Sequence, residues 1–169
     1  KYVELADSYK SLNESLLHAS VHNNTSLEIE FIDSEDIKKS NMRILNNVQG
    51  IVVPGGFGNR GINGKILTAQ HARVNNIPYL GICLGMQISV IEFSRNVLGL
   101  KKANSTEFDI NTPHPVISLV TEWEDFKRGK LRGSLKHMGG TMRLGAQKCK
   151  LVRSSLAHSL YKKNIITER

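Results

Sequence analysis

The sequence predicts an α/β protein with a doubly wound, mostly parallel sheet, and three observations lead to this fold class. The 169 residues, 40% hydrophobic and 22% charged, have the composition of one globular domain. Short apolar runs alternate with stretches of helical composition over the first hundred residues, and two of these runs end directly in glycine-containing turns. Strands that alternate with helices form right-handed crossovers, which give a parallel sheet covered on both faces.

The elements of the first hundred residues follow from alternation, branching and capping. Strands are expected where apolar residues alternate with polar ones or form a β-branched run. Helices are expected where apolar residues recur every three or four positions after a capping residue. We therefore expect strands at 2–5, 27–33, 51–53 and 78–82, and helices at 7–18, 64–75 and 84–98.

The elements after residue 100 are less regular. The polar stretch 104–115 contains two prolines and predicts a loop. Residues 122–140 are charged and contain glycine, which predicts a mobile insertion. The other expected elements are a strand at 116–120, a hairpin of 141–144 with 148–152, a helix from Ser154 or Ser155 to Tyr161, and a strand at 165–169.

Composition and cysteine usage favour an intracellular protein. The longest apolar runs contain only a few residues, so we expect no membrane span, and the first residues lack the apolar core of a signal peptide. The two cysteines, Cys83 and Cys149, lie far apart in the chain. Widely separated thiols suggest a reducing compartment, and we expect a cytoplasmic location.

The net charge of +8 is unevenly distributed along the chain. Residues 1–123 carry 11 Lys and Arg against 12 Asp and Glu, whereas residues 124–169 carry 12 against three. The basic stretch 127–137, KRGKLRGSLKH, contains no aromatic side chain on which bases could stack, so nucleic acid is not an expected partner. The stretch is interpreted as a solvated loop or as a docking surface for an acidic partner or a phosphate.

The chemically informative stretch is YLGICLGMQ, residues 79–87. A buried strand runs into a G-x-C-x-G turn, and a helix starts at once. This is the thiol counterpart of the G-x-S-x-G nucleophile elbow, in which glycines relieve the crowding of a strained turn. Cys83 is therefore the candidate nucleophile, although a cysteine without such a frame is usually a small buried hydrophobe. Cys149 has no such frame and is interpreted as structural.

A cysteine nucleophile at this turn needs an activating group. A thiol with a pKa of about 8.5 is only a few per cent ionised at neutral pH, and a helix N-terminus contributes only about 0.3–1 kcal/mol. A base such as histidine is therefore expected beside Cys83. None of the six histidines is followed by an orienting x-Glu or x-Asp, and none is chosen as that base: His18, His22, His71, His114, His137 and His158.

A second glycine turn, Pro54–Gly58, follows the neighbouring strand. Backbone N–H groups in such a loop can stabilise a developing oxyanion together with the amide that follows the nucleophile. Here these amides would be those of Gly56 and Leu84, although a plain tight turn is an open alternative. The later Gly61–Lys65 does not complete a nucleotide phosphate loop, because Ile66 stands where Ser or Thr is required.

Five motifs together resemble one protein family. In chain order they are PGGFGNRG (54–61), GICLGMQ (81–87), NVLGLKKANSTEF (96–108), NTPHPVI (111–117) and GGTMRLG (139–145). They resemble the glutaminase domains of the CTP synthase family, which are class I glutamine amidotransferases. The resemblance covers nearly the whole chain and implies a flavodoxin-like sheet.

The resemblance implies roles for the residues of the two turns. Cys83 would attack the side-chain amide of glutamine and form a γ-glutamyl thioester. Gly56 and Leu84 would donate to the oxyanion. Gln87 and Glu107, together with Gly56, would hold the glutamine substrate.

The resemblance also implies partners outside this stretch of chain. Phe57 and Arg60 would face the synthetase domain and a GTP activator. No cofactor or metal is expected in this domain itself, because ATP and magnesium would belong to the synthetase domain, within a homotetramer. The family's His-x-Glu pair and arginine-rich glutamine-binding segment would lie beyond Arg169. Residues 1–169 are thus expected to be an incomplete glutaminase domain, truncated at its C-terminus, with little activity alone.

Two other functions are compatible with parts of the sequence. Another cysteine hydrolase, such as a γ-glutamyl hydrolase, could be built on the same elbow, although Gln87, Glu107 and the motif at 139–145 argue against it. A non-catalytic assembly module is the second alternative, because the basic region 124–153 could dock against a neighbouring subunit.

Overall fold

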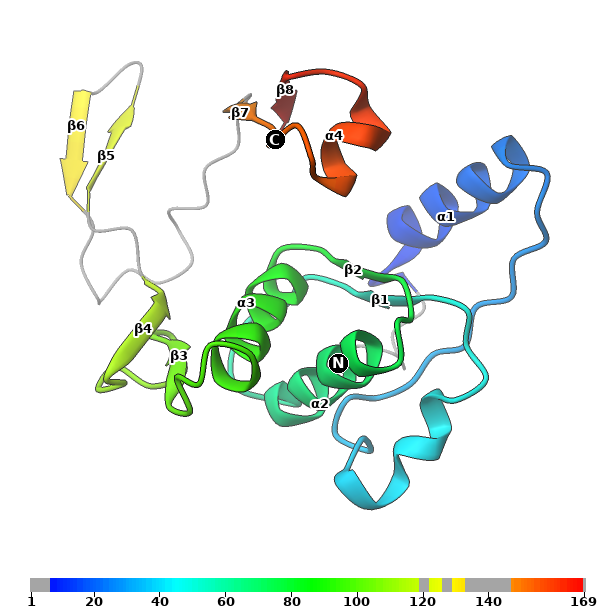
Figure 1. Cartoon of the computed structure of the whole chain (residues 1–169), viewed down its shortest axis with the longest axis horizontal. Helices are drawn as coiled ribbons and strands as arrows, with labels where there is room; N and C mark the ends of the chain where they lie inside the picture. Colours follow the sequence, from blue (N-terminus) through cyan, green and yellow to red (C-terminus); the bar gives the residue numbers. More distant parts are fainter. Residues whose placement is uncertain (1–6, 119–121, 126–128, 133–146, 169) are drawn as a thin grey trace. The chain divides into compact units, whose positions relative to one another are not determined.

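The computed structural model describes residues 7–118, 122–125, 129–132 and 147–168 (Figure 1). The chain divides into two compact units, Lys1–Leu119 and Val120–Arg169. The strand expected at 2–5, the segment 141–144 of the expected hairpin, and His137 lie outside the described residues. No helix in the described ranges is long and apolar enough to cross a membrane.

The first unit contains most of the regular structure. Its elements are α1 (Lys10–His22), the 3₁₀ helix η1 (Lys39–Leu45), β1 (Ile51–Val53), α2 (Ile62–Val74), β2 (Tyr79–Gly81), α3 (Leu84–Asn96), β3 (Ala103–Ser105) and β4 (His114–Ile117). β1 pairs with β2 and β3 with β4, both in parallel. The strands expected at 51–53 and 78–82 and the three helices are thereby confirmed, with shifted ends.

Two helices cover one face of the β1–β2 pair. α2 and α3 pack side by side and both contact β2 (Figure 1). Their shared core contains the fully buried Leu84, Ile88 and Ile91, and the β1 side chains Ile51 and Val53 pack with Ala72 of α2 in a second cluster. This core fixes where β1 and β2 end, and both glycine turns begin at those ends.

The sheet is less extensive in the described residues than the sequence suggests. Each hydrogen-bonded sheet in the described residues has two strands. Where one doubly wound sheet was expected, the first unit therefore shows two parallel strand pairs. The strand expected at 27–33 is wrong: residues 25–33 form no helix or strand, and Phe31 is 51% exposed. Apolar alternation alone cannot make a strand, because its N–H and C=O groups need a paired neighbour. The loop expected at 104–115 is also partly wrong, since β3 and the start of β4 occupy its two ends.

The second unit consists of two antiparallel strand pairs and one short helix. β5 (Glu122–Asp125) pairs with β6 (Gly129–Arg132), so the insertion expected at 122–140 contains a hairpin. β7 (Gln147–Lys150) pairs with β8 (Ile165–Glu168), far along the chain. Between them lies α4 (Leu156–Tyr161). Ser155 Oγ accepts from the His158 amide at 3.2 Å, which confirms the expected helix cap.

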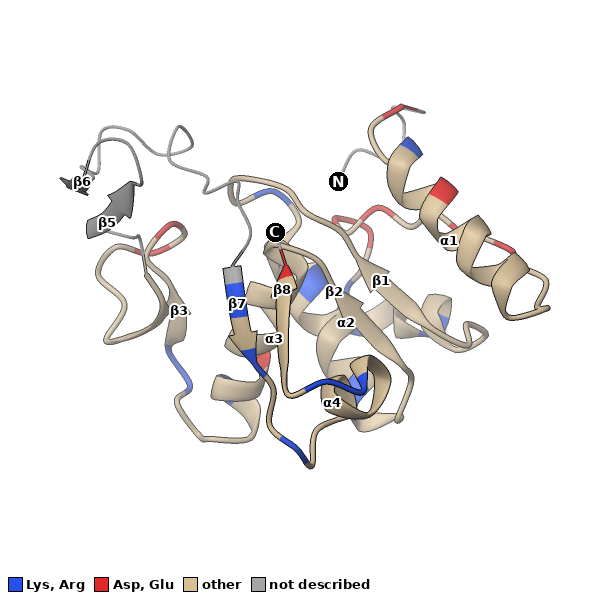
Figure 2. Ribbon diagram, turned by 90° about the horizontal axis from the view of Figure 1, so that it is seen from above, with Lys and Arg blue, Asp and Glu red and all other residues tan. Residues whose placement is uncertain are grey.

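The described part of the second unit is basic. Residues 147–168 contain five Lys and Arg and one Glu. Figure 2 shows these cations in β7 and on both sides of α4, whereas the red acidic positions lie mainly in the first unit. The described residues thus preserve the charge asymmetry of the sequence.

Candidate active site

Cys83 is held in a strained backbone conformation at the start of α3. It is the residue that precedes the helix, with φ 55° and ψ −110°, and its side chain is exposed. A non-glycine residue in such a sparsely populated region costs about 1–3 kcal/mol and persists only when its surroundings enforce it. The sharp strand-to-helix turn expected of a nucleophile elbow is therefore present.

Close backbone packing explains the glycines on either side of Cys83. A Cβ on Gly81 would lie 2.5 Å from the Gly85 carbonyl carbon and the Met86 nitrogen, and a Cβ on Gly85 would overlap the Val53 carbonyl oxygen. The turn is also tied to β1, because Ile82 donates from its amide to Val53 O at 3.0 Å. No larger residue fits at either glycine without a shift of strand or helix.

The side chain of Tyr79 connects the two ends of this turn. Its hydroxyl donates to the carbonyl oxygen of Gly85 at 2.8 Å, so a residue of β2 is joined to the first turn of α3. Burial, together with the nearby charge of Glu92, raises the pKa of the Tyr79 phenol above its ordinary value, so the hydroxyl remains a donor well above neutral pH. Local pattern did not single out Tyr79; the available signal was an aromatic hydroxyl two residues before the G-x-C-x-G turn.

The glycine loop after β1 lies directly against the nucleophile. A Cβ on Gly55 would lie 3.4 Å from the Cys83 Cβ and 3.8 Å from Sγ, so the absent side chain leaves room for the thiol. Gly56 is the next residue of this loop, and Leu84 is the first residue of α3. Adjacent parallel strands thus bring both expected oxyanion donors to one sheet edge, as ligand sites of open α/β folds require.

Glu107 reaches the same loop from the connection between β3 and β4. Its Oε1 accepts from the Gly58 amide at 3.1 Å, which joins residues 49 positions apart in sequence. Gln87 lies one helical turn after Cys83 and is half-buried, and its backbone N–H donates to Cys83 O at 3.2 Å. The structure thus brings Glu107 to the glycine loop and Gln87 to the elbow.

The end of the glycine loop is fixed by charged groups. Arg60 pairs with Asp33 at 3.2 Å and with Glu35 at 2.6 Å, and Lys65 Nζ donates to Arg60 O at 3.2 Å. The hydrogen bond from the Glu35 amide, together with Arg60 and Lys65, lowers the pKa of Asp33. Phe57 is 57% exposed. The guanidinium of Arg60 is therefore already engaged by two carboxylates.

An ion pair between an exposed arginine and a buried glutamate joins α2 and α3. Arg73 of α2 donates from Nη2 and Nε to the carboxylate of Glu92 on α3 at 2.8 to 3.2 Å. Asn96 adds a hydrogen bond at 3.0 Å, and the Glu92 side chain is only 3% exposed. The hydrogen bonds to Glu92 raise the pKa of Arg73. A paired carboxylate of this kind fixes the packing of α2 against α3.

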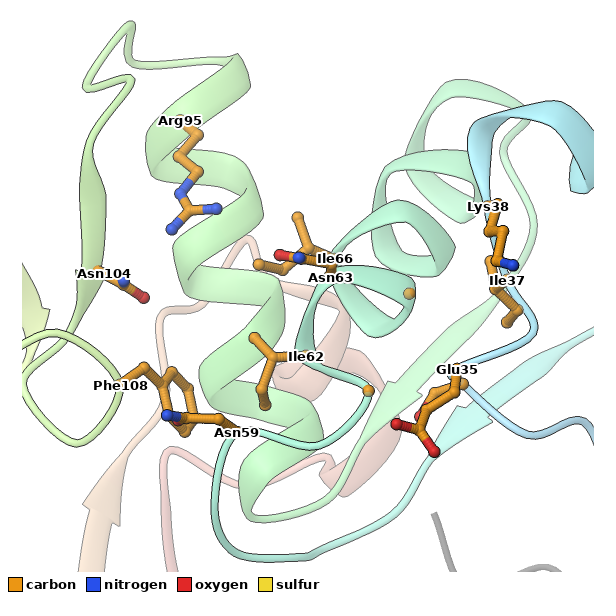
Figure 3. Close-up of a pocket in the computed structure, with 13 residues that line it drawn as sticks. Glu35, Ile37, Lys38, Asn59, Ile62, Asn63, Ile66, Arg95, Asn104 and Phe108 are labelled. Carbon is orange, nitrogen blue, oxygen red and sulfur yellow. The ribbon is translucent and has the colours of Figure 1, made fainter.

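Two of the cavities among the described residues of the first unit border the glycine loop. One of about 310 Å³ is lined by the beginning of α1 and by Pro54, Gly55 and Ile82, so it borders both active-site turns. The larger, about 440 Å³, surrounds the start of α2 (Figure 3). Its lining includes Asn59, Arg95 and Phe108 but not Cys83. Cys83 is not in the lining of the smaller cavity either, but its neighbours Ile82 and Gly55 are, so the smaller cavity lies nearer to the elbow.

The base that Cys83 requires is not found among the described histidines. Within those residues the thiol has no hydrogen bond to a histidine; His71 contacts Asn75, and His158 contacts Asn164. Within the same ranges no group of three or more His, Cys, Asp or Glu is arranged to hold a metal ion. The described site therefore offers a candidate nucleophile and candidate backbone donors.

A strand-to-helix turn that carries a cysteine beside a glycine loop is typical of a class of protein, and comparison with known protein families identifies that class. The model of the family "Glutamine amidotransferase class-I" matches residues 4–168, so this chain belongs to the class I glutamine amidotransferases. The expected fold class is confirmed with it.

A solved structure narrows the similarity within this family. The chain is similar to the glutaminase domain of Trypanosoma brucei CTPS, CTP synthase, solved with bound acivicin, at 37% identity and a TM-score of 0.79. The match covers all of this chain and 62% of that one. The resemblance seen in the five sequence motifs is therefore confirmed.

Proposed function

We propose that this chain is the glutamine-hydrolysing part of a CTP synthase. The observation that carries the proposal is the placement of Cys83, strained at the start of α3 with the glycine loop against its Sγ. The similarity to the CTPS glutaminase domain supports the choice of glutamine as the substrate and of this member within the family.

The reaction follows from the groups at the sheet edge. The Cys83 thiolate attacks the side-chain carbonyl carbon of glutamine, and the carbonyl oxygen becomes an oxyanion that accepts from the amides of Gly56 and Leu84. When this intermediate collapses, its nitrogen takes up the proton that the thiol gave up, ammonia leaves, and a γ-glutamyl thioester remains. Water then attacks the thioester, releases glutamate and restores the thiol.

Two polar side chains are suited to hold the free amino acid. Glu107 uses one carboxylate oxygen on the Gly58 amide, and its other oxygen is available to accept from the substrate ammonium. Gln87 offers an amide at the other end of the substrate, one helical turn after the nucleophile. A charged acceptor and a neutral amide match the zwitterionic head and the polar side chain of glutamine.

The ammonia would be used outside this chain. We propose that a synthetase domain aminates UTP to CTP with ATP and magnesium, in a cytoplasmic homotetramer that serves pyrimidine nucleotide synthesis. Phe57 and Arg60 would face that domain and a GTP activator. Arg60 would have to exchange Asp33 or Glu35 for a phosphate, since both carboxylates now pair with it.

Covalent labelling tests this proposal directly. The full-length protein is incubated with a diazo-ketone analogue of glutamine and analysed by peptide mass spectrometry. We expect a single adduct on Cys83 that excess glutamine prevents, with Cys149 as the internal control because it is also exposed. An adduct on Cys149 with Cys83 unmodified would contradict the proposal. Acivicin, the compound bound in the related domain, is a second probe.

A further inference from the structure

The strained turn at Cys83 needs restraints, and most of them are backbone contacts. Ile82 donates to Val53 O at 3.0 Å, Gly85 donates to Ile82 O at 3.0 Å, and Gln87 donates to Cys83 O at 3.2 Å. These bonds tie the turn to β1 and close the first turns of α3. Because any sequence with this backbone would make them, they do not distinguish one elbow from another.

Tyr79 adds a restraint that depends on a side chain. In the part of the chain that the structure describes, its hydroxyl makes the only side-chain hydrogen bond between β2 and α3, to Gly85 O at 2.8 Å. The bond spans residues 80 to 84, with Cys83 inside the span. The Tyr79 ring also packs against both core clusters, so the hydroxyl is held at a fixed place.

We infer that Tyr79 is a positioning residue for the Cys83 nucleophile, an inference that rests on the proposed function. Its hydroxyl holds the first turn of α3 against β2, and that turn carries the Leu84 amide as well as the bond to the Cys83 carbonyl. Without this hydroxyl, α3 can move relative to β2, and the thiol and the oxyanion donor lose their alignment. The fold would persist because the ring remains in the core.

The test compares Tyr79→Phe with wild type in the full-length protein. Tyr161→Phe is the matched control, because it also removes one hydrogen-bonded hydroxyl, here paired with Glu168 in the second unit. Inactivation by the diazo-ketone glutamine analogue gives a maximal rate constant and a half-saturating concentration. Iodoacetamide needs no alignment with an oxyanion site, so its rate of reaction at Cys83 reports the access and ionisation of the thiol.

We expect Tyr79→Phe to lower the maximal inactivation rate about tenfold, because small displacements of a nucleophile have large effects on rate. The half-saturating concentration and the iodoacetamide rate should stay within about twofold of wild type, and Tyr161→Phe should match wild type in all three. A merely structural role would slow both reagents together.

Two outcomes would overturn the inference alone. One is a maximal rate for Tyr79→Phe equal to that of wild type; the other is an equal loss with both reagents. If the analogue does not label Cys83 in the wild-type protein, the proposed function fails, and this inference fails with it. The wild-type measurement therefore separates the two failures.

Discussion

The two active-site turns are both rich in glycine and both follow parallel strands, yet they are held in different ways. The elbow, residues 81–85, is fixed by backbone packing on β1 and by the hydroxyl of the partly buried Tyr79. The glycine loop, 54–61, is exposed from Phe57 to Arg60 and is held by carboxylates from other segments.

The difference indicates which part of the site can adapt. The position of the nucleophile depends on packing, which salt and moderate pH do not alter. The position of the glycine loop depends on charge pairs at the surface, which salt screens and acid removes. The elbow should therefore respond to changes of volume, and the loop to changes of charge.

The largest effect is expected at the elbow. Gly85→Ala places a Cβ on the Val53 carbonyl oxygen, so β1 or α3 must move. We expect a loss of about 3 kcal/mol in unfolding free energy and slow labelling of Cys83, measured by chemical denaturation and by mass spectrometry. Gly50→Ala is the control, because its Cβ would lie 3.8 Å from the nearest atom. A stable, rapidly labelled Gly85→Ala protein would break the comparison.

The next effect concerns the helices beneath the elbow. Arg73→Ala leaves the Glu92 carboxylate buried with Asn96 as its remaining partner. The buried carboxylate then lacks its main counter-charge, so we expect Arg73→Ala to have a lower melting temperature than wild type. Arg43→Ala is the control, since exposed Arg43 forms no ion pair among the described residues. Equal melting temperatures for the two variants would contradict the assignment.

At the glycine loop, removing a charge should affect the site more than changing the volume of a side chain. Glu107→Gln keeps an oxygen that can accept from the Gly58 amide but removes the negative charge. We expect the KM for glutamine to rise about tenfold, because a hydrogen bond to a charged group contributes about 1.5–3 kcal/mol. Asp109→Asn, two residues further on, is the control; its carboxylate accepts from the Asn111 amide. An unchanged KM for Glu107→Gln would remove Glu107 from the substrate site.

The smallest effect is expected at Asp33, and it depends on pH. The pKa of Asp33 is lowered in the folded state, so its contribution is present above the unfolded value of about 3.9 and is lost as pH falls through the lower folded value. Asp33→Asn should therefore cost about 1 kcal/mol at pH 7 and less below about pH 4.

Denaturation curves at pH 7 and below about pH 4 measure how much the cost of Asp33→Asn changes with pH. Asp36→Asn is the control. Asp36 forms no ion pair within the described ranges. If the cost of Asp33→Asn is the same at both pH values, charge does not hold the loop.

The elements of the site could be predicted from the sequence, and its long-range contacts could not. The elbow at Cys83 and the helices that became α2 and α3 depend on local pattern, which a single chain displays. The pairing of β7 with β8 and the bond from Gly58 to Glu107 join segments distant in sequence. No local pattern encodes such pairs, so neither the pairing of β7 with β8 nor the Gly58 contact was foreseen.

The pairing of Val53 with Gly81 also sets a length. Neighbouring strands in a sheet lie about 4.8 Å apart, a value fixed by the peptide hydrogen bond. One strand leads to the Cys83 thiol and its neighbour leads to the amides of the glycine loop. The spacing of the two strands therefore sets the distance between the thiol and those amides. A protein derived from this fold could change its nucleophile, its leaving group or its substrate and still keep this distance.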